Sequence, residues 1–202
     1  MIIKYHYSHM NGYEYLMSHS PDLWDEIKTV LKKIEPSNLK PKISKEKFKK
    51  GEELISPIEI KNMFDKLMKK QKWQKKIKKY MVSANQEFNE ILKNESFLVQ
   101  KKMSTQKKEI KTYVSSNAIN HLKNDISINL QLGKYSFVHF DIFNHISNYF
   151  SGEIKLGIIL VPTKKMSQHM STGISFYEKN LHEIQRCRGN YPGIPMILGG
   201  VE

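Results

Sequence analysis

Apolar residues recur at helical spacing in two segments of the first half of the chain. The first segment begins at Ser20-Pro21, where a hydroxyl that can cap a helix precedes a proline at the first helical position. The second begins at Ser56-Pro57-Ile58-Glu59, which combines a proline start with a capping box. Two helices are therefore predicted, with apolar stripes formed by Leu23, Ile27, Val30, Leu31 and Ile34 in the first and by Met63, Phe64 and Leu67 in the second.

The rest of the first half is rich in lysine and has little periodicity. Pro36, Pro41 and a cluster of lysines interrupt the pattern up to Gly51, which predicts a basic loop. From about Met81 to Ser116, scattered apolar residues favour one or two further helices over a sheet.

The second half alternates between strand and helix patterns. Residues 126–132 alternate apolar and polar side chains up to Gly133, which predicts a strand with Asn129 and Gln131 on one face. Aromatic and apolar residues then recur at roughly helical spacing from Phe137 to Phe150. The almost continuously apolar run 154–161 is typical of a strand buried on both faces. A helix over 176–185 and a last strand over 194–198 follow, in which Pro195 indicates a sheet edge or a strand start.

This order of elements predicts an α/β fold. A chain of 202 residues with 39% apolar content can bury one sizeable core, so we expect a single domain over residues 1–202. Residues 1–116 are expected to be mainly helical with a basic loop, and residues 117–202 to hold the sheet.

The charge of the chain points to an anionic partner. The formal net charge is +13, from 33 basic and 20 acidic residues, which indicates that a polyanion is bound. Eight of the fourteen residues from Lys66 to Lys79 are lysines; a solvated helix face explains this run as well as a binding surface does. An anionic membrane surface would also satisfy the charge, but no strongly amphipathic terminal helix is present to insert.

Several classes of protein are excluded by composition. The lone Cys187 excludes an intramolecular disulfide framework, and no apolar run is long enough to cross a bilayer. The start of the chain lacks the apolar region of a secretory signal, so a reducing cytoplasm is the expected compartment.

Three separated motifs carry a resemblance to a known family. They are YSHMNGYEY at residues 7–15, QLGKYSFV at 131–138 and MSTGISFYE at 170–178. With them the chain resembles, over nearly its whole length, type II restriction endonucleases of the BstYI group, and more distantly BglII and BamHI, within the PD-(D/E)xK nucleases. The resemblance implies a restriction-endonuclease-like fold, with a central mixed β-sheet flanked by helices. It also implies Mg²⁺-dependent cleavage of purine-GATC-pyrimidine before the guanine.

The same resemblance assigns the catalytic positions. The family has Glu-x-Gln on its catalytic strand and an aspartate nine residues before the glutamate. Gln131 matches the glutamine, whereas Asn129 stands at the glutamate position and Asn120 at the aspartate position. Both acids that should hold the metal are therefore absent.

Asparagine keeps nearly the shape of a carboxylate but carries no charge and has one carbonyl acceptor. A phosphodiester repels a nucleophile, and Mg²⁺ held on carboxylates offsets that charge and activates a water. We therefore expect this form of the enzyme to fold and bind DNA, with Mg²⁺ binding weak or absent and cleavage lost or strongly impaired. Two isosteric replacements at the two expected positions indicate deliberate inactivation; a natural non-cleaving homologue is the alternative. Asp125 could be considered as a substitute metal ligand, but it lies four residues before Asn129, which does not match the family's spacing.

The resemblance also implies the DNA contacts and the assembly. DNA-reading positions of the family correspond to Lys134 and to Ser171, Thr172 and Ser175, and Thr172 stands where the closest pattern has serine, which leaves the outer base pair open. Lys134 could instead contact a phosphate, and Arg186 and Arg188 could grip phosphates or lie on a plain surface. A palindromic site in double-stranded DNA implies a homodimer, for which the helix around 140–150 is as good an interface candidate as a core element. A cognate DNA methyltransferase is expected in the same system, although not as a complex.

Two other classes of protein are alternative interpretations of the sequence. A DNA-binding protein without a cleavage role is the first, although no helix-turn-helix pattern is present. The second is a basic membrane- or ribosome-associated protein, which would show no preference for GATC duplexes over scrambled ones.

Overall fold

The computed structural model describes residues 1–187 and 191–202, which divide into two compact units. The first unit comprises residues 1–74 and 120–202, and the second comprises residues 75–119. The expectation of a single domain over the whole chain remains a prediction. None of the helices in the described part of the chain has the length and apolar character that crossing a membrane requires.

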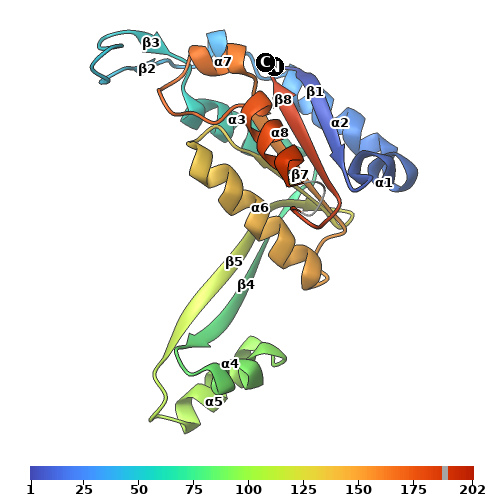
Figure 1. The fold of residues 1–202 in the computed structure, drawn as a ribbon, viewed down its shortest axis with the longest axis vertical. Coiled ribbons are helices and arrows are strands. Elements are labelled where there is room, and N and C mark those ends of the chain that lie inside the picture. The colour runs from blue at the N-terminus through green and yellow to red at the C-terminus, as the bar shows by residue number, and fades with distance from the viewer. Residues whose placement is uncertain (188–190) are drawn as a thin grey trace. The chain divides into compact units, whose positions relative to one another are not determined.

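A mixed six-stranded sheet organises the fold (Figure 1), and its order is β1 (Ile3–His9), β8 (Met196–Val201), β7 (Leu156–Pro162), β6 (Ile126–Leu130), β5 (Thr112–Lys123) and β4 (Gln74–Ser83). Strand β8 is antiparallel to β1 and parallel to β7, and β7 is parallel to β6. Strand β6 is antiparallel to β5. The predicted fold class, a central mixed sheet flanked by helices, is confirmed.

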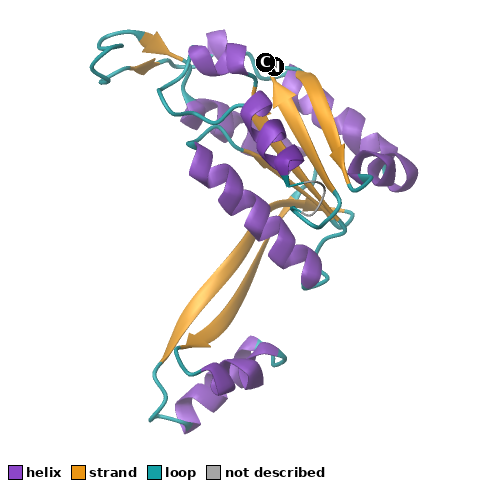
Figure 2. Ribbon diagram, viewed as in Figure 1, coloured by secondary structure: helices purple, strands orange, loops and turns teal. Residues whose placement is uncertain are grey.

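Helices cover both faces of the sheet in the first unit (Figure 2). One core joins the sheet to α1 (Gly12–His19), α2 (Pro21–Lys32) and α3 (Pro57–Lys70). The other joins it to α6 (Tyr135–Phe150) and α8 (Tyr177–Arg186). Strand β7 serves both cores, because Ile158 and Leu160 belong to the first and Ile159 and Val161 to the second. The prediction that this strand is buried on both faces is confirmed.

The two predicted helix starts differ in their capping. Helix α3 begins as expected, since the Ser56 hydroxyl accepts a hydrogen bond from the Glu59 N–H at 3.4 Å. Helix α2 begins at Pro21, but the Ser20 side chain makes no capping hydrogen bond. Between them, the predicted basic loop contains a 3₁₀ turn, η1 (Pro36–Asn38), and a short antiparallel hairpin of β2 (Lys42–Ile43) and β3 (Glu53–Leu54).

The second unit corrects the prediction that the middle of the chain has only helices. It contains α4 (Gln86–Lys93) and α5 (Phe97–Gln106), but these lie between β4 and β5. The lysine run is not one helix: α3 ends at Lys70, Lys72 has a left-handed φ of 64°, and β4 begins at Gln74. Residues 74–79 are all exposed, so no alternation of buried and exposed side chains marks the strand in the sequence.

The C-terminal elements are close to their predicted positions. A short helix, α7 (Lys164–Gln168), follows β7, and α8 covers the predicted helix. Pro195 directly precedes β8, so the strand-start interpretation is confirmed, whereas the edge interpretation is wrong because β8 lies between β1 and β7.

Candidate active site

A tight hairpin brings Asn120 and Asn129 face to face. Strands β5 and β6 are joined by Asn124 and Asp125, whose φ angles of 49° and 58° are those of a type I′ turn. The register pairs Leu122 with Ser127 and, continued by two residues, sets Asn120 opposite Asn129. Side chains opposite one another in this way have Cβ atoms about 5 Å apart. The nine-residue spacing is thus the consequence of a two-residue turn.

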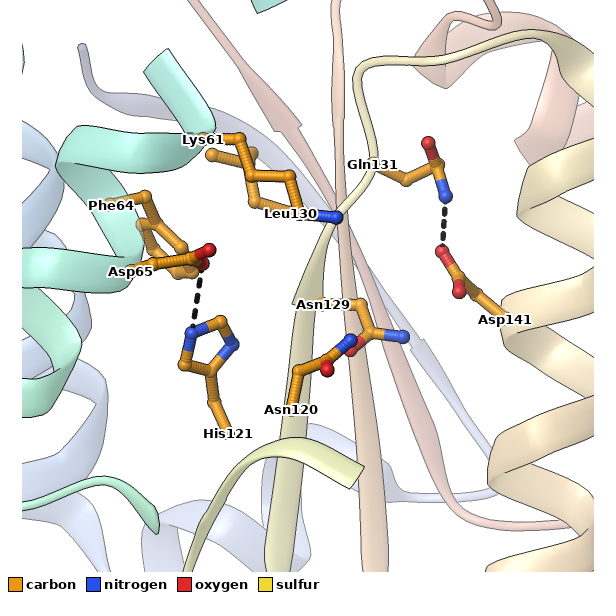
Figure 3. A pocket seen from close by; sticks show the side chains of 9 residues that line it. All are labelled: Lys61, Phe64, Asp65, Asn120, His121, Asn129, Leu130, Gln131 and Asp141. Atoms are coloured by element: carbon orange, nitrogen blue, oxygen red, sulfur yellow. Dashed lines mark hydrogen bonds and ion pairs between the residues drawn. The ribbon is translucent and has the colours of Figure 1, made fainter. Parts of the chain in front are cut away.

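These two asparagines line a polar hollow (Figure 3). Helix α3 lines it on one side, α6 on the other, and β5 and β6 form its floor. The lining residues are Lys61, Phe64, Asp65, Asn120, His121, Asn129, Leu130, Gln131 and Asp141. The structure therefore brings together the three residues that the sequence assigned to catalysis, Asn120, Asn129 and Gln131.

Gln131 links the strand end to a buried acid. Its Nε2 donates to Asp141 Oδ2 at 2.6 Å, and its Oε1 accepts from the Gly133 N–H at 2.9 Å. Burial raises the pKa of the Asp141 carboxyl, while hydrogen bonds from Gln131 and Asn129 and the charge of Lys61 act in the opposite direction. The Asp141 carboxyl thus already accepts hydrogen bonds from Gln131 and Asn129.

A second acid in the hollow is paired with a histidine. His121 Nε2 lies 3.0 Å from Asp65 Oδ1, and His121 Nδ1 lies 3.3 Å from the Ile128 carbonyl oxygen. The ring is buried with its edge against Phe64, and burial lowers the pKa of His121 more than the charge of Asp65 raises it. The pair joins α3 to the hairpin of β5 and β6.

The side chains of the hollow do not fit Mg²⁺. This ion prefers carboxylate oxygens in octahedral geometry, and the facing positions offer two neutral amides. Asp141 is engaged by Gln131 and Asn129, and Asp65 by His121. Within the described ranges 1–187 and 191–202, no cluster of three or more His, Cys, Asp or Glu side chains could hold a metal ion.

The predicted DNA-reading residues lie close together, three on the loop 171–175 and Lys134 directly before α6. Lys134 forms an isolated antiparallel bridge with Ile174, and the Ser175 N–H donates to the Gly133 carbonyl at 3.0 Å. Lys134 and Thr172 are exposed and Ser171 is half-buried. Ser175 is 1% exposed, and its hydroxyl accepts from Asn180 Nδ2 at 2.7 Å, so its side chain supports the loop from inside.

The remaining candidates lie elsewhere. Arg186 is exposed at the end of α8 and pairs with Glu183 at 3.1 Å. Arg188, named as a phosphate contact from the sequence, lies outside the described residues. Asp125 occupies the hairpin turn and does not line the hollow, which removes it as a substitute ligand there.

Four polar residues of the hollow were not predicted as site residues from the sequence: Lys61, Asp65, His121 and Asp141. For Asp141 a signal exists, because it falls on the buried stripe of α6 with Val138, Ile142 and His145, where an acid is unusual. For Lys61 and Asp65 we find no such signal, since both are ordinary polar residues of a half-exposed helix.

Comparisons with known proteins identify the family and the fold of the chain. The family model described as restriction endonuclease BglII/BglIII matches residues 5–201. The solved structure titled "Crystal structure of free BglII" superposes with a TM-score of 0.61 at 18% sequence identity, over 100% of this chain and 80% of that chain. None of the curated proteins matches the chain.

Proposed function

Since the chain belongs to the BglII/BglIII family of restriction endonucleases, which are type II site-specific deoxyribonucleases, we propose that it binds a GATC-centred palindrome as a homodimer without cleaving it efficiently. The site resembles that of the BstYI group, and the proposed target is purine-GATC-pyrimidine, which active members would cut before the guanine. A sequence-specific DNA-binding homologue with no cleavage role is the alternative.

The observation that carries the proposal is the facing pair Asn120 and Asn129, which lies with Gln131 in one polar hollow. Metal-dependent phosphodiester hydrolysis needs charge on these two positions, because the cation offsets the charge of the phosphate and activates the water. Two amides keep the shape of the pair and remove its charge. Binding of DNA does not depend on that charge, so recognition is expected to survive.

The loop of residues 168–175, which we call the recognition loop, and the adjacent Lys134 support a major-groove contact. Lys134 can donate to guanine O6 and N7, and the hydroxyls of Ser171 and Thr172 can donate or accept. The same lysine could instead bind a phosphate, as could Arg186 and Arg188, which would position the protein without reading sequence.

Two-fold symmetry supports the homodimer, since each subunit would present the same surface to one half of a palindrome. A cognate methyltransferase acting on the same site is expected in the same system, because an active relative would otherwise cut its own genome.

The decisive experiment compares this chain with the double variant Asn120→Asp, Asn129→Glu. We expect the parent to shift GATC duplexes in a gel and the double variant to cleave plasmid DNA with Mg²⁺, faster by on the order of 100-fold or more. Asn124→Asp adds an acid to the same hairpin outside the hollow and should leave cleavage unchanged.

The outcomes separate the candidates. If the double variant binds GATC duplexes but never cuts, the non-cleaving homologue is correct. If neither protein prefers a GATC duplex to a scrambled one, the family's function does not extend to this chain.

A further inference from the structure

The hairpin of the basic loop is hydrogen-bonded along the recognition loop. Lys49 Nζ donates to the carbonyl oxygens of Gln168 and Met170 at 2.9 and 3.1 Å. The Ile55 N–H donates to the His169 carbonyl at 2.9 Å, and Lys42 Nζ donates to the Ser171 hydroxyl at 2.5 Å. Every residue from Gln168 to Ser171 thus has a partner on the segment 42–55.

The last residue of this series, Thr172, is held by Glu46. Both carboxylate oxygens of Glu46 lie 3.1 Å from the Thr172 backbone nitrogen, and Glu46 Oε2 also accepts from the Thr172 hydroxyl. The hydrogen bond from the Thr172 hydroxyl lowers the pKa of Glu46 most, and the one from the Thr172 N–H lowers it further. A hydrogen bond from Ser171 and the charge of Lys42 act in the same direction. Glu46 is therefore ionised at neutral pH.

An ionised carboxylate decides which way the hydroxyl of Thr172 points. A hydroxyl has one donor hydrogen and two acceptor lone pairs, and a carboxylate can only accept. The Thr172 hydrogen must therefore lie on the Glu46 side. Thr172 is exposed, and its hydroxyl oxygen can still accept a hydrogen bond from a ligand through its lone pairs.

We propose that Glu46 is a specificity-determining residue. By accepting the hydrogen bond of the Thr172 hydroxyl, it leaves Thr172 able to contact the outer base pair only as a hydrogen-bond acceptor. This inference rests on the proposed function, because it needs Thr172 at the DNA. In the major groove, adenine N6 and cytosine N4 are donors, whereas guanine O6 and thymine O4 are acceptors. A hydroxyl free to rotate would tolerate all four, but an acceptor-only oxygen favours A over G at the purine or C over T at the pyrimidine.

The test measures binding to three duplexes that contain AGATCT, GGATCC or a scrambled site, at one salt concentration. We expect the parent to distinguish AGATCT from GGATCC by at least about 5-fold, since the disfavoured pair leaves an acceptor facing an acceptor. The sign of the preference identifies the base that Thr172 contacts.

Two variants test the mechanism. In Glu46→Gln an NH₂ group replaces one of the two carboxylate oxygens. If it faced the Thr172 N–H, two donors would oppose each other, so the NH₂ group should face the hydroxyl instead, and the preference should vanish or invert. Thr172→Val removes the hydroxyl while keeping the side-chain shape and should also bring the two duplexes to within about 2-fold of each other.

Glu52→Gln is the matched control, because it makes the same charge change in the same exposed hairpin without contacting Thr172. It should tighten binding to all three duplexes equally and leave the preference unchanged. A Glu46→Gln protein that keeps the parent's preference overturns the inference.

The remaining outcomes distinguish this inference from the proposed function. If the parent prefers GATC duplexes but treats AGATCT and GGATCC alike, only the role of Glu46 is refuted. If the parent does not prefer GATC to the scrambled site, the proposed function fails and this inference with it. Glu46 and Thr172 lie at the surface, so matching thermal unfolding curves are expected and would show that each variant is folded.

Discussion

At the residue scale, burial strongly changes the titration of His145. It lies on α6 against β7, where it is 1% exposed, and a Cβ added at Gly157 would come within 2.8 Å of its ring. Burial lowers the pKa of His145 to about 4, and among the described residues its Nε2 has no hydrogen-bond partner. The imidazole is therefore neutral in the folded protein.

This burial predicts a loss of stability in mild acid. The pKa of His145 is 6.5 in the unfolded chain and about 4 in the folded one, so below pH 6.5 the unfolded state binds the proton first. The contribution is complete above pH 6.5 and falls by about 3 kcal/mol as the pH decreases through 4. Urea unfolding of the parent and of His145→Gln between pH 7 and 4 measures it.

The difference between these two proteins is the quantity to follow, since His9 and His121 also have pKa values lowered by burial. His182→Gln, at an exposed position on α8, should keep the parent's pH dependence. A His145→Gln protein whose free energy of unfolding declines as steeply as the parent's would contradict the assignment.

At the scale of elements, the opening motif forms a turn from strand to helix. Met10 and Asn11 have positive φ values of 47° and 58°, and the Ser8 hydroxyl accepts from the Tyr13 N–H at 3.0 Å while donating to Glu14 at 2.5 Å. The first residue of α1, Gly12, then meets the backbone of β8. This family motif therefore has a structural role in joining β1, α1 and β8.

Gly12→Ala should destabilise the fold. A Cβ at this position would lie 2.6 Å from the Met196 carbonyl oxygen and 2.7 Å from its nitrogen, and a backbone in the middle of a sheet cannot move aside easily. We expect the free energy of unfolding to fall by about 1–3 kcal/mol, as in other overpacked sites. Ser18→Ala on the exposed side of α1 provides the control for the same measurement. Equal stability of the two variants would show that α1 can shift on β8.

At the scale of the whole molecule, α6 carries an apolar surface that no other described element covers. Phe137, Phe140, Phe143 and Phe150 are 53–74% exposed on the side of α6 opposite its buried stripe. Exposed aromatic groups of this extent are typical of an interaction surface. The proposed palindromic target would require a second copy of the chain, and this is the occupant that we expect on the surface.

Charge placed on this surface should separate the dimer. We expect the parent to sediment with the mass of two chains and the double variant Phe140→Asp, Phe143→Asp to sediment as one, because two buried carboxylates would have no partner. Phe48→Asp, at a 92% exposed position on the basic hairpin, should remain dimeric. A dimeric Phe140→Asp, Phe143→Asp protein would place the interface elsewhere, and a monomeric parent would refute the homodimer.

Much of the fold of the first unit was predictable because its elements have one buried and one exposed side. Helices α2, α3, α6 and α8 and strands β6 and β7 lie close to their predicted positions. The hairpin strands of the second unit escaped prediction because their exposed lysines carry no period of burial. No helix or strand was predicted over residues 1–19, because β1 is a half-exposed edge strand and α1 begins at a glycine.

The sequence by itself determined the α/β class and the cationic character, which follow from local periodicity and from total charge. The catalytic roles of Asn120, Asn129 and Gln131 and the DNA-reading role of the recognition loop come from the family resemblance of three motifs, and they stay predictions. Tertiary structure alone decided that Asp141 accepts a hydrogen bond from Gln131 and that Glu46 accepts one from the Thr172 hydroxyl. Glu46 and Thr172 are 126 residues apart, and no local pattern encodes a hydrogen bond between side chains that only the folded chain brings together.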